Sequence, residues 1–216
     1  MVCDPSPVME QVQAKKKPSL RARQKELRKK QMLEAARKLF IANGYSKTSI
    51  ETIAQNAEVG VATVYTYFEN KENLAANLIR SDINEIFWEV SRVSESLPDD
   101  PAEAVIKLID VLVNFHKFIT AELLREFVSE ARINGPVGEV WDWTHRNQIA
   151  AIARVLARGK ELGRVAEPLD VETAAALIID LMDRHLNKLT TSGNTKSIDG
   201  QLEQFIRLLF VEWTPG

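Results

Sequence analysis

The sequence predicts an all-α fold of about nine helices, and three observations support this prediction. Apolar residues recur three and four positions apart through most of the 216 residues, which places them on one face of successive helices. The chain contains only nine Gly and eight Pro, the residues that most often interrupt helices. No segment shows the alternation of apolar and polar residues that is typical of a half-buried strand.

The composition indicates a packed protein. Hydrophobic residues make up 45% of the chain and charged residues 27%, which supports a core and argues against global disorder. No stretch approaches the ~18 apolar residues of a membrane span, and the polar N-terminal segment lacks the apolar region of a signal peptide. The only cysteine, Cys3, excludes an intramolecular disulfide and a cysteine-based metal cluster. We therefore expect a cytoplasmic protein with no membrane partner.

Charge is divided unevenly along the chain. Residues 1–47 carry 12 Lys or Arg and four Asp or Glu, a net charge of +8, whereas residues 48–216 carry 16 and 26, a net charge of −10. Residues 1–21, with three prolines and a lysine run, are predicted to form a disordered basic tail. A basic end on an acidic body is typical of a protein that binds a polyanion, although solvated charge runs are also common.

Start and stop signals define the predicted helices. Gly44 ends the first helix because glycine accepts the left-handed backbone of a C-terminal cap. Ser49 and Asn70 are expected N-caps. The predicted helices span residues 22–43, 50–57, 61–68, 71–93, 101–117, 120–133, 138–162, 171–189 and 197–211.

Residues 50–68 fit a helix-turn-helix, which needs two short helices, a sharp turn and a free outer face on the second helix. Their shared core is predicted to contain Ile53, Ala57, Val59 and Val64. The second helix then presents hydroxyl groups outward, and hydroxyls can meet phosphates and base edges. This pattern predicts an N-terminal three-helix, DNA-binding domain over residues 22–70 and a C-terminal helical domain over 71–216.

A longer motif surrounds this segment. It consists of Gly44-Tyr45, Thr48-Ser49-Ile50, Ile53-Ala54 and the signature Thr63-Val64-Tyr65-x-Tyr67-Phe68-x-x-Lys71-Glu72-x-Leu74. Through these residues, the stretch 24–78 resembles the TetR (tetracycline-repressor-like) family. It implies a homodimeric regulator, usually a repressor, whose C-terminal domain dimerises and often encloses a small effector.

The resemblance implies roles for individual positions. Ser49 would cap the second helix, the Tyr65 hydroxyl would contact phosphate, and Lys71 would bind phosphate at the start of the fourth helix. The expected DNA-binding residues are Thr48, Ser49, Val61, Ala62, Thr63, Tyr65, Thr66, Tyr67 and Lys71.

Two positions depart from the family pattern. Glu58 occupies a turn position where glycine is usual, so we expect a left-handed backbone there that costs roughly 1–2 kcal/mol. Gly60 stands where a serine or threonine N-cap is common, and glycine is only a fair cap.

Residues 171–189 and 197–213 are predicted to form a two-fold homodimer interface. The run 174–176 is all alanine and permits close helix approach, and the last helix is apolar on most sides. Apolar area on the earlier helix would come from Leu177, Ile178, Leu181 and Met182. Such a dimer would place two recognition helices about 34–36 Å apart on a palindromic operator.

Aromatic residues concentrate in the middle helices and predict a small-molecule effector of hydrophobic or aromatic character, although ordinary core packing is an alternative. The candidate ligand-binding residues are Phe87, Phe115, His116, Phe127, Trp141 and His145. The three histidines lack the spacing of metal ligands, so neither a metal site nor a cofactor is expected.

An enzyme is not expected, because the sequence contains no phosphate-binding glycine loop, no nucleophile elbow and no paired His-Glu metal motif. A second alternative is a DNA-binding protein of the same fold that a protein partner controls in place of a small ligand. The sequence does not distinguish this alternative from a small-molecule sensor.

Overall fold

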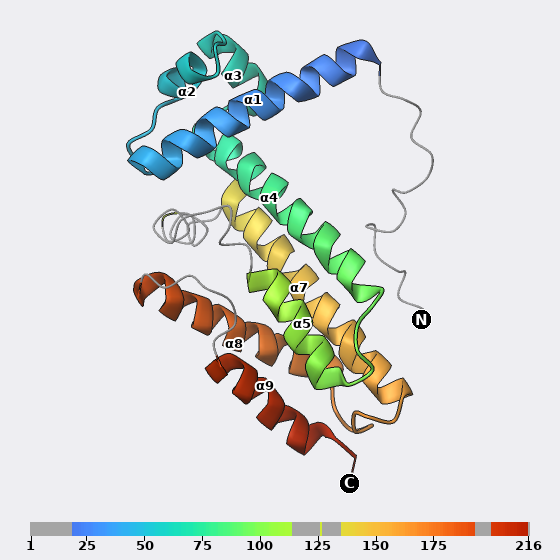
Figure 1. Cartoon of the computed structure of the whole chain (residues 1–216). Coiled ribbons are helices and arrows are strands. Elements are labelled where there is room, and N and C mark those ends of the chain that lie inside the picture. Colours follow the sequence, from blue (N-terminus) through green and yellow to red (C-terminus); the bar gives the residue numbers. More distant parts are fainter. Residues whose placement is uncertain (1–18, 114–125, 127–134, 193–199, 216) are drawn as a thin grey trace.

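The computed structural model describes residues 19–113, 126, 135–192 and 200–215, which form helices and contain no strand (Figure 1). The all-α prediction is therefore confirmed for this part of the chain. The predicted helix at 120–133 lies outside it, apart from Glu126. The helices are α1 (Leu20–Asn43), α2 (Ile50–Asn56), α3 (Val61–Phe68), α4 (Lys71–Ser94), α5 (Pro101–Val113), α7 (Pro136–Glu161), α8 (Val171–Ser192) and α9 (Gly200–Trp213).

Local capping explains where the helices begin. Helix α1 starts at Leu20, two residues before its predicted start, because the Ser19 hydroxyl accepts a hydrogen bond from the Ala22 amide at 3.2 Å. The predicted caps Ser49 and Asn70 are confirmed, since each accepts a backbone hydrogen bond at the start of its helix. Helix α7 starts at Pro136, because proline is tolerated in the first helical turn.

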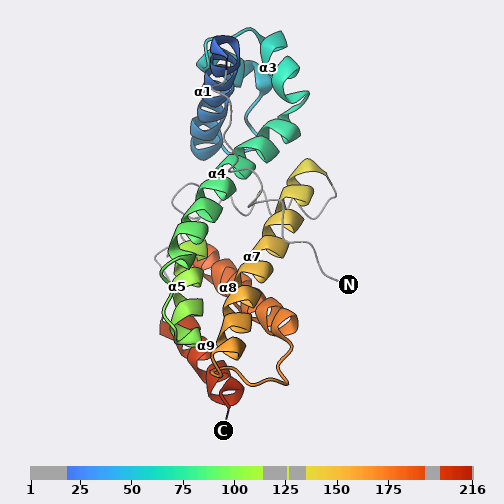
Figure 2. The same cartoon turned by 90° about the vertical axis from the view of Figure 1, so that its right-hand side faces the viewer.

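The helices form an elongated molecule (Figures 1 and 2). Its buried side chains form two hydrophobic cores. The N-terminal core joins α1, α2 and α3 to the first half of α4 and the start of α7. The C-terminal core joins the second half of α4 to α5, α7, α8 and α9. Helix α4 therefore belongs to both, with Leu74, Leu78 and Ile83 in one core and Ile86 and Val90 in the other.

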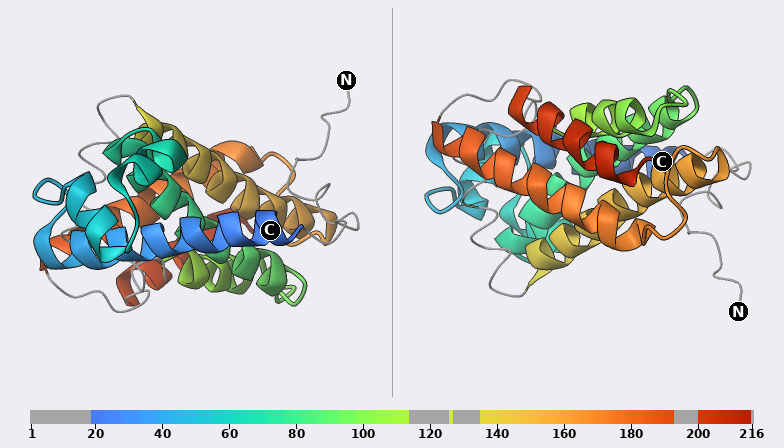
Figure 3. Two further views of the ribbon diagram at one scale, coloured as in Figure 1. Left: turned by 90° about the horizontal axis from the view of Figure 1, so that it is seen from above. Right: turned by 90° about the horizontal axis from the view of Figure 1, so that it is seen from below.

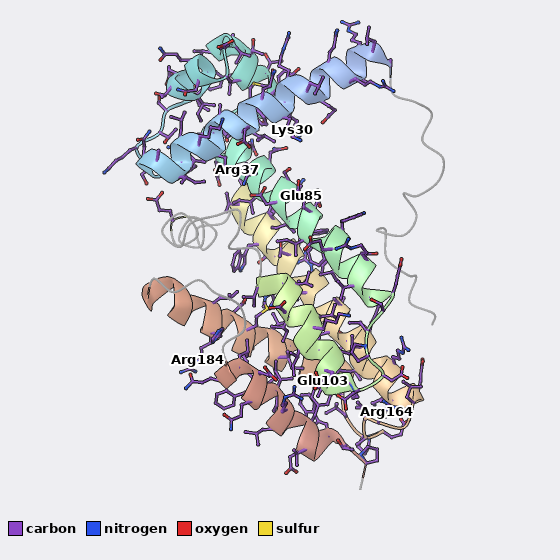
Figure 4. All side chains as sticks on the ribbon, viewed as in Figure 1. Lys30, Arg37, Glu85, Glu103, Arg164 and Arg184 are labelled. Atoms are coloured by element: carbon purple, nitrogen blue, oxygen red, sulfur yellow. The ribbon has the colours of Figure 1, made fainter. Side chains whose placement is uncertain are left out.

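A charged pair is buried where α1 crosses α4, beside the Arg37 label in Figure 4. The Arg37 guanidinium donates to both carboxylate oxygens of Asp82, one of them at 2.7 Å, and Asp82 is only 1% exposed. Glu34 approaches the same guanidinium at 3.5 Å from the solvent side. A bidentate pair of this kind fixes orientation as well as distance, so it sets the angle between the two helices.

Helices α8 and α9 expose apolar side chains in the single chain. Leu202, Ile206 and Phe210 of α9 face the C-terminal core. The opposite side of α9 exposes Phe205, Leu208 and Val211, and Leu177 of α8 is exposed as well.

The interface prediction needs one correction. Ile178 and Met182 are buried in the chain's own core, so they cannot supply the apolar contact area predicted for α8. Ala174 and Ala175 are buried there as well, so the close approach that they permit is within the chain. Helical periodicity shows which residues are buried, but it does not distinguish a core from an interface. Among the described helices, none combines the length and apolar character needed to cross a lipid bilayer.

Replacing Asp82 with Asn should lower the free energy of unfolding by about 3 kcal/mol, because it leaves the Arg37 charge without its buried partner. Urea unfolding monitored by circular dichroism measures the change. Glu34→Ala is the matched control: its carboxylate approaches the same guanidinium but is 53% exposed, so its loss should cost less than about 1 kcal/mol. Equal effects of the two variants would contradict the structural role of the buried pair.

Candidate nucleic-acid interface and regulatory site

Helix α3 is held to the rest of the chain by one side only. Val64 and Phe68 are buried in the N-terminal core, and Ile53 and Ala54 of α2 complete the contact. The turn between the helices has the expected left-handed residue, since Glu58 has a φ of +53°. Gly60 caps α3 without a side-chain hydrogen bond, as its lack of a side chain predicts. The two helices are therefore fixed by packing and by the turn backbone.

The other side of α3 is open to solvent. Val61, Ala62, Tyr65 and Thr66 are exposed, and Thr63 and Tyr67 are partly exposed. The Thr66 hydroxyl donates to the Ala62 carbonyl at 2.8 Å. The top view in Figure 3 shows α2 and α3 beside the C-terminal half of α1. This surface combines small, apolar and hydroxyl-bearing side chains that suit base edges and phosphates in a major groove.

Two predicted contact residues precede α2, and they differ in position. Ser49 is exposed, and its hydroxyl accepts from the Thr52 amide at 3.2 Å. Thr48 is only 3% exposed, and its hydroxyl donates to the Gly44 carbonyl at 2.8 Å. The predicted side-chain contact of Thr48 with DNA is therefore wrong. The Thr48 hydroxyl closes the turn after α1, and a sequence motif alone does not reveal this role.

Lys71 is engaged with the chain's own backbone. Its ammonium group donates to the carbonyls of Tyr45 and Thr48 at 3.1 Å and to that of Ser46 at 3.5 Å. It also lies 4.3 Å from the centroid of the Tyr45 ring. Two of the three N–H donors of the ammonium are therefore within ordinary hydrogen-bond distance of a carbonyl, and the third has a longer contact. A phosphate contact by this side chain would compete with these carbonyls.

The first half of α1 forms a basic surface next to α3. Residues 20–31 contain six Lys or Arg and one Glu, and nearly all of these residues are exposed. The Lys25 ammonium lies 6.0 Å from the centroid of the partly exposed Tyr67 ring, near the C-terminal end of α3. The charge excess near the N-terminus indicates this surface in the sequence, but only the fold shows that Lys25 lies near Tyr67 of α3.

Comparison with known proteins identifies the family of this chain. The family model described as bacterial regulatory proteins of the tetR family matches residues 32–78. The HTH-type transcriptional regulator YhgD of Bacillus subtilis is 32% identical over 179 residues, which cover 77% of this chain and 91% of that protein. The chain belongs to the TetR family of transcriptional regulators.

Solved structures share the fold of this TetR-family regulator. A TetR transcription regulator from Haloarcula marismortui has a TM-score of 0.71 at 16% identity and covers 88% of this chain and 97% of its own. The regulator FadR from Bacillus subtilis in complex with stearoyl-CoA has a TM-score of 0.65 at 18% identity, with 84% and 95% covered. The family is one of transcriptional regulators, as the sequence indicated, and not of enzymes.

The candidate ligand-binding residues of this TetR-family regulator are only partly within the described structure. Phe115, His116 and Phe127 lie outside the described residues. Phe87 packs edge-on against Trp143 with ring centroids 5.4 Å apart. Trp141 and Trp143 are both partly buried against the N-terminal core, and Phe87 lies against both cores.

An ion pair that sequence reasoning missed lies between α7 and α8. The Nδ1 atom of His145 is 3.5 Å from a carboxylate oxygen of Asp183. Burial raises the pKa of the Asp183 carboxyl from 3.8 to about 6, while the charge of His145 lowers it and that of Asp180 raises it. His145 lies on α7 and Asp183 on α8, far apart in the sequence. No local motif could therefore have predicted that they meet.

The raised pKa of Asp183 predicts a pH-dependent stability. Between about pH 4 and pH 6 the folded protein keeps a proton that the unfolded chain loses, so stability falls as pH rises through this window. Asp183→Asn should remove this loss. The change that it causes in the free energy of unfolding should therefore be more favourable at pH 7 than at pH 4 by about 2 kcal/mol. Thermal melting across this pH range measures it.

Glu161, which is exposed at the end of α7, provides the control. Glu161→Gln should produce a much smaller difference between the two pH values, because it removes a carboxyl group that is not buried. A stabilisation by Asp183→Asn that is the same at pH 4 and pH 7 would contradict the assignment.

Proposed function

We propose that this TetR-family regulator is a repressor that binds a palindromic operator as a homodimer and is released by a small hydrophobic or aromatic effector. Residues 22–70 would form the DNA-binding domain and residues 71–216 the regulatory and dimerisation domain. The single observation that carries the proposal is the solvent-open, hydroxyl-bearing side of α3, which is anchored from behind by Val64 and Phe68. Such a helix is positioned to enter a major groove.

The proposed contacts divide by chemistry. Val61 and Ala62 would meet base edges through apolar contact, for example with a thymine methyl group, and Thr63 would offer a hydroxyl. Ser49 and Tyr65 would contact phosphates, which set the register of the protein on the duplex without reading sequence. The remaining proposed contact residues are Thr66 and Tyr67.

The basic first half of α1 would add further phosphate contacts beside the recognition helix. Its charge excess comes from Arg21, Arg23, Lys25, Arg28, Lys29 and Lys30. Cations that neutralise phosphates release counterions from the duplex, so this surface would make operator binding strongly dependent on salt concentration.

The exposed apolar side of α9 supports a two-fold dimer. Phe205, Leu208 and Val211 lie on it, and Leu177 of α8 is exposed as well. Removing large apolar side chains from water favours association. The proposed interface therefore depends mainly on α9 and on Leu177.

An apolar effector is supported by the aromatic contact between Phe87 and Trp143 and by the partly buried polar pair His145 and Asp183. The complex of FadR with stearoyl-CoA suggests long-chain acyl-CoA as the first effector class to test. Because Phe87 lies on α4, which also supports α3, an effector that favours one position of α4 would change operator affinity. Control by a protein partner is the alternative.

Selection of bound duplexes from a random DNA pool tests the proposed function. The wild type should enrich a palindrome, because two α3 helices related by two-fold symmetry read the same sequence on opposite strands. Thr63→Ala should relax the preference at one position of each half-site at a cost of about 1–3 kcal/mol, whereas the distant Thr173→Ala should not. Failure to enrich any sequence would contradict operator binding.

The same selection repeated with long-chain acyl-CoA tests release. Loss of the enriched sequence at saturating ligand would support the proposed effector class. Binding of the ligand without any change in operator affinity would favour control by a protein partner.

Leu208→Glu should convert the dimer into a monomer, because it places a charge in the proposed apolar interface. Sedimentation at micromolar concentration measures the mass, and operator affinity should fall with it. Leu162→Glu is the matched control, since Leu162 is an exposed leucine at the end of α7. A wild-type protein that sediments as a monomer would contradict the interface.

A further inference from the structure

Two charged side chains bind the backbone of one residue, Tyr45, in the loop between α1 and α2, residues 44–49. The Tyr45 amide donates to the Glu126 carboxylate at 2.6 Å. The Tyr45 carbonyl accepts from the Lys71 ammonium at 3.1 Å. Glu126 is distant in sequence and belongs to the proposed regulatory domain, whereas Lys71 is the first residue of α4. Both polar groups of this residue's backbone are therefore bound by charged side chains.

The loop is shaped to receive the Glu126 carboxylate. Gly44 has a φ of +83°, and a Cβ built at this position would lie only 3.1 Å from a Glu126 oxygen. Glycine thus satisfies the backbone conformation and leaves room for the carboxylate. A hydrogen bond from an amide to an ionised carboxylate is about twice as strong as one between neutral groups.

The loop also determines where α2 begins. Ser49, its last residue, caps α2, and the buried Thr48 closes the turn through Gly44. The Tyr45 ring packs on Phe40 of α1 with centroids 5.3 Å apart. A shift of this loop would therefore move α2, and α3 would follow because the two helices share one core.

We infer that Glu126 and Lys71 are positioning residues, which hold the α1–α2 loop from opposite sides and thereby set the helix-turn-helix for operator binding. The effect on DNA rests on the proposed function. In this arrangement Lys71 acts through the protein backbone and not through a phosphate. Glu126 gives the proposed regulatory domain a direct contact with the DNA-binding domain, separate from α4.

The first test measures the loop without DNA. Hydrogen exchange followed by NMR or mass spectrometry should show faster exchange in residues 44–49 for Glu126→Ala than for the wild type. Glu126→Gln should restore most of the protection, because an amide oxygen can still accept from the Tyr45 N–H. The control Glu139→Ala removes an exposed carboxylate at the start of α7 and should have no effect on the loop. Unchanged exchange in Glu126→Ala would overturn the inference.

The second test measures operator affinity at several salt concentrations. Glu126→Ala removes one hydrogen bond to a charged group and should weaken binding about tenfold. Lys71→Ala removes the contacts with three carbonyls and should weaken binding at least as much. The salt dependence should stay as in the wild type, whereas loss of a phosphate contact would lower its slope by about 1. Thermal melting of each variant establishes that it is folded under the conditions of the assay.

The outcomes separate the inference from the proposed function. A Lys71→Ala variant with a slope lower by about 1 would overturn the positioning role and assign Lys71 to phosphate. Wild-type affinity in Glu126→Ala would overturn the role of Glu126. A wild type that selects no DNA sequence would defeat the proposed function, while the exchange measurements would still decide whether Glu126 holds the loop.

Discussion

Helix α4 supplies side chains to both hydrophobic cores, and this shared helix constrains the arrangement of everything around it. Leu74 and Leu78 pack beneath the helix-turn-helix, while Ile86 and Val90 pack among α5, α7 and α8. A helix transmits a displacement along its axis because its backbone hydrogen bonds resist bending. The Arg37–Asp82 pair then fixes how α1 crosses this helix. The position of α3 consequently depends on residues that are far from it in sequence.

The surface proposed to bind DNA is open because the anchoring of α3 is confined to one side. Val64 and Phe68 are four residues apart and lie on the same face, which leaves the other positions to solvent. The strained turn at Glu58 brings α3 across α2 at the angle that this packing needs. A left-handed glutamate persists there because the surrounding contacts determine the backbone more strongly than its own preference does.

Charged groups around the N-terminal core are engaged by the chain itself. Asp82 accepts from a guanidinium, Glu126 from a backbone amide, and Lys71 donates to three carbonyls. Partly buried charges must be compensated in this way, because an unpaired one would cost several kcal/mol. Such contacts are directional, so they hold one relative position of the helices more narrowly than apolar packing does.

For the described part of the chain, the sequence by itself determined the helices to within a few residues, the caps Ser49 and Asn70, and the burial of Val64 in α3, because these depend on spacing and on hydrogen bonds within a few residues. It also identified the left-handed Glu58 and the exposed side of the recognition helix. The tertiary structure decided which distant groups meet: Asp82 lies 45 residues from Arg37, and Tyr45 lies 26 residues from Lys71. It also buried Thr48 and placed Ala174 and Ala175 in the chain's own core. Periodicity shows that a residue faces inward, but only the packing of helices decides what it faces.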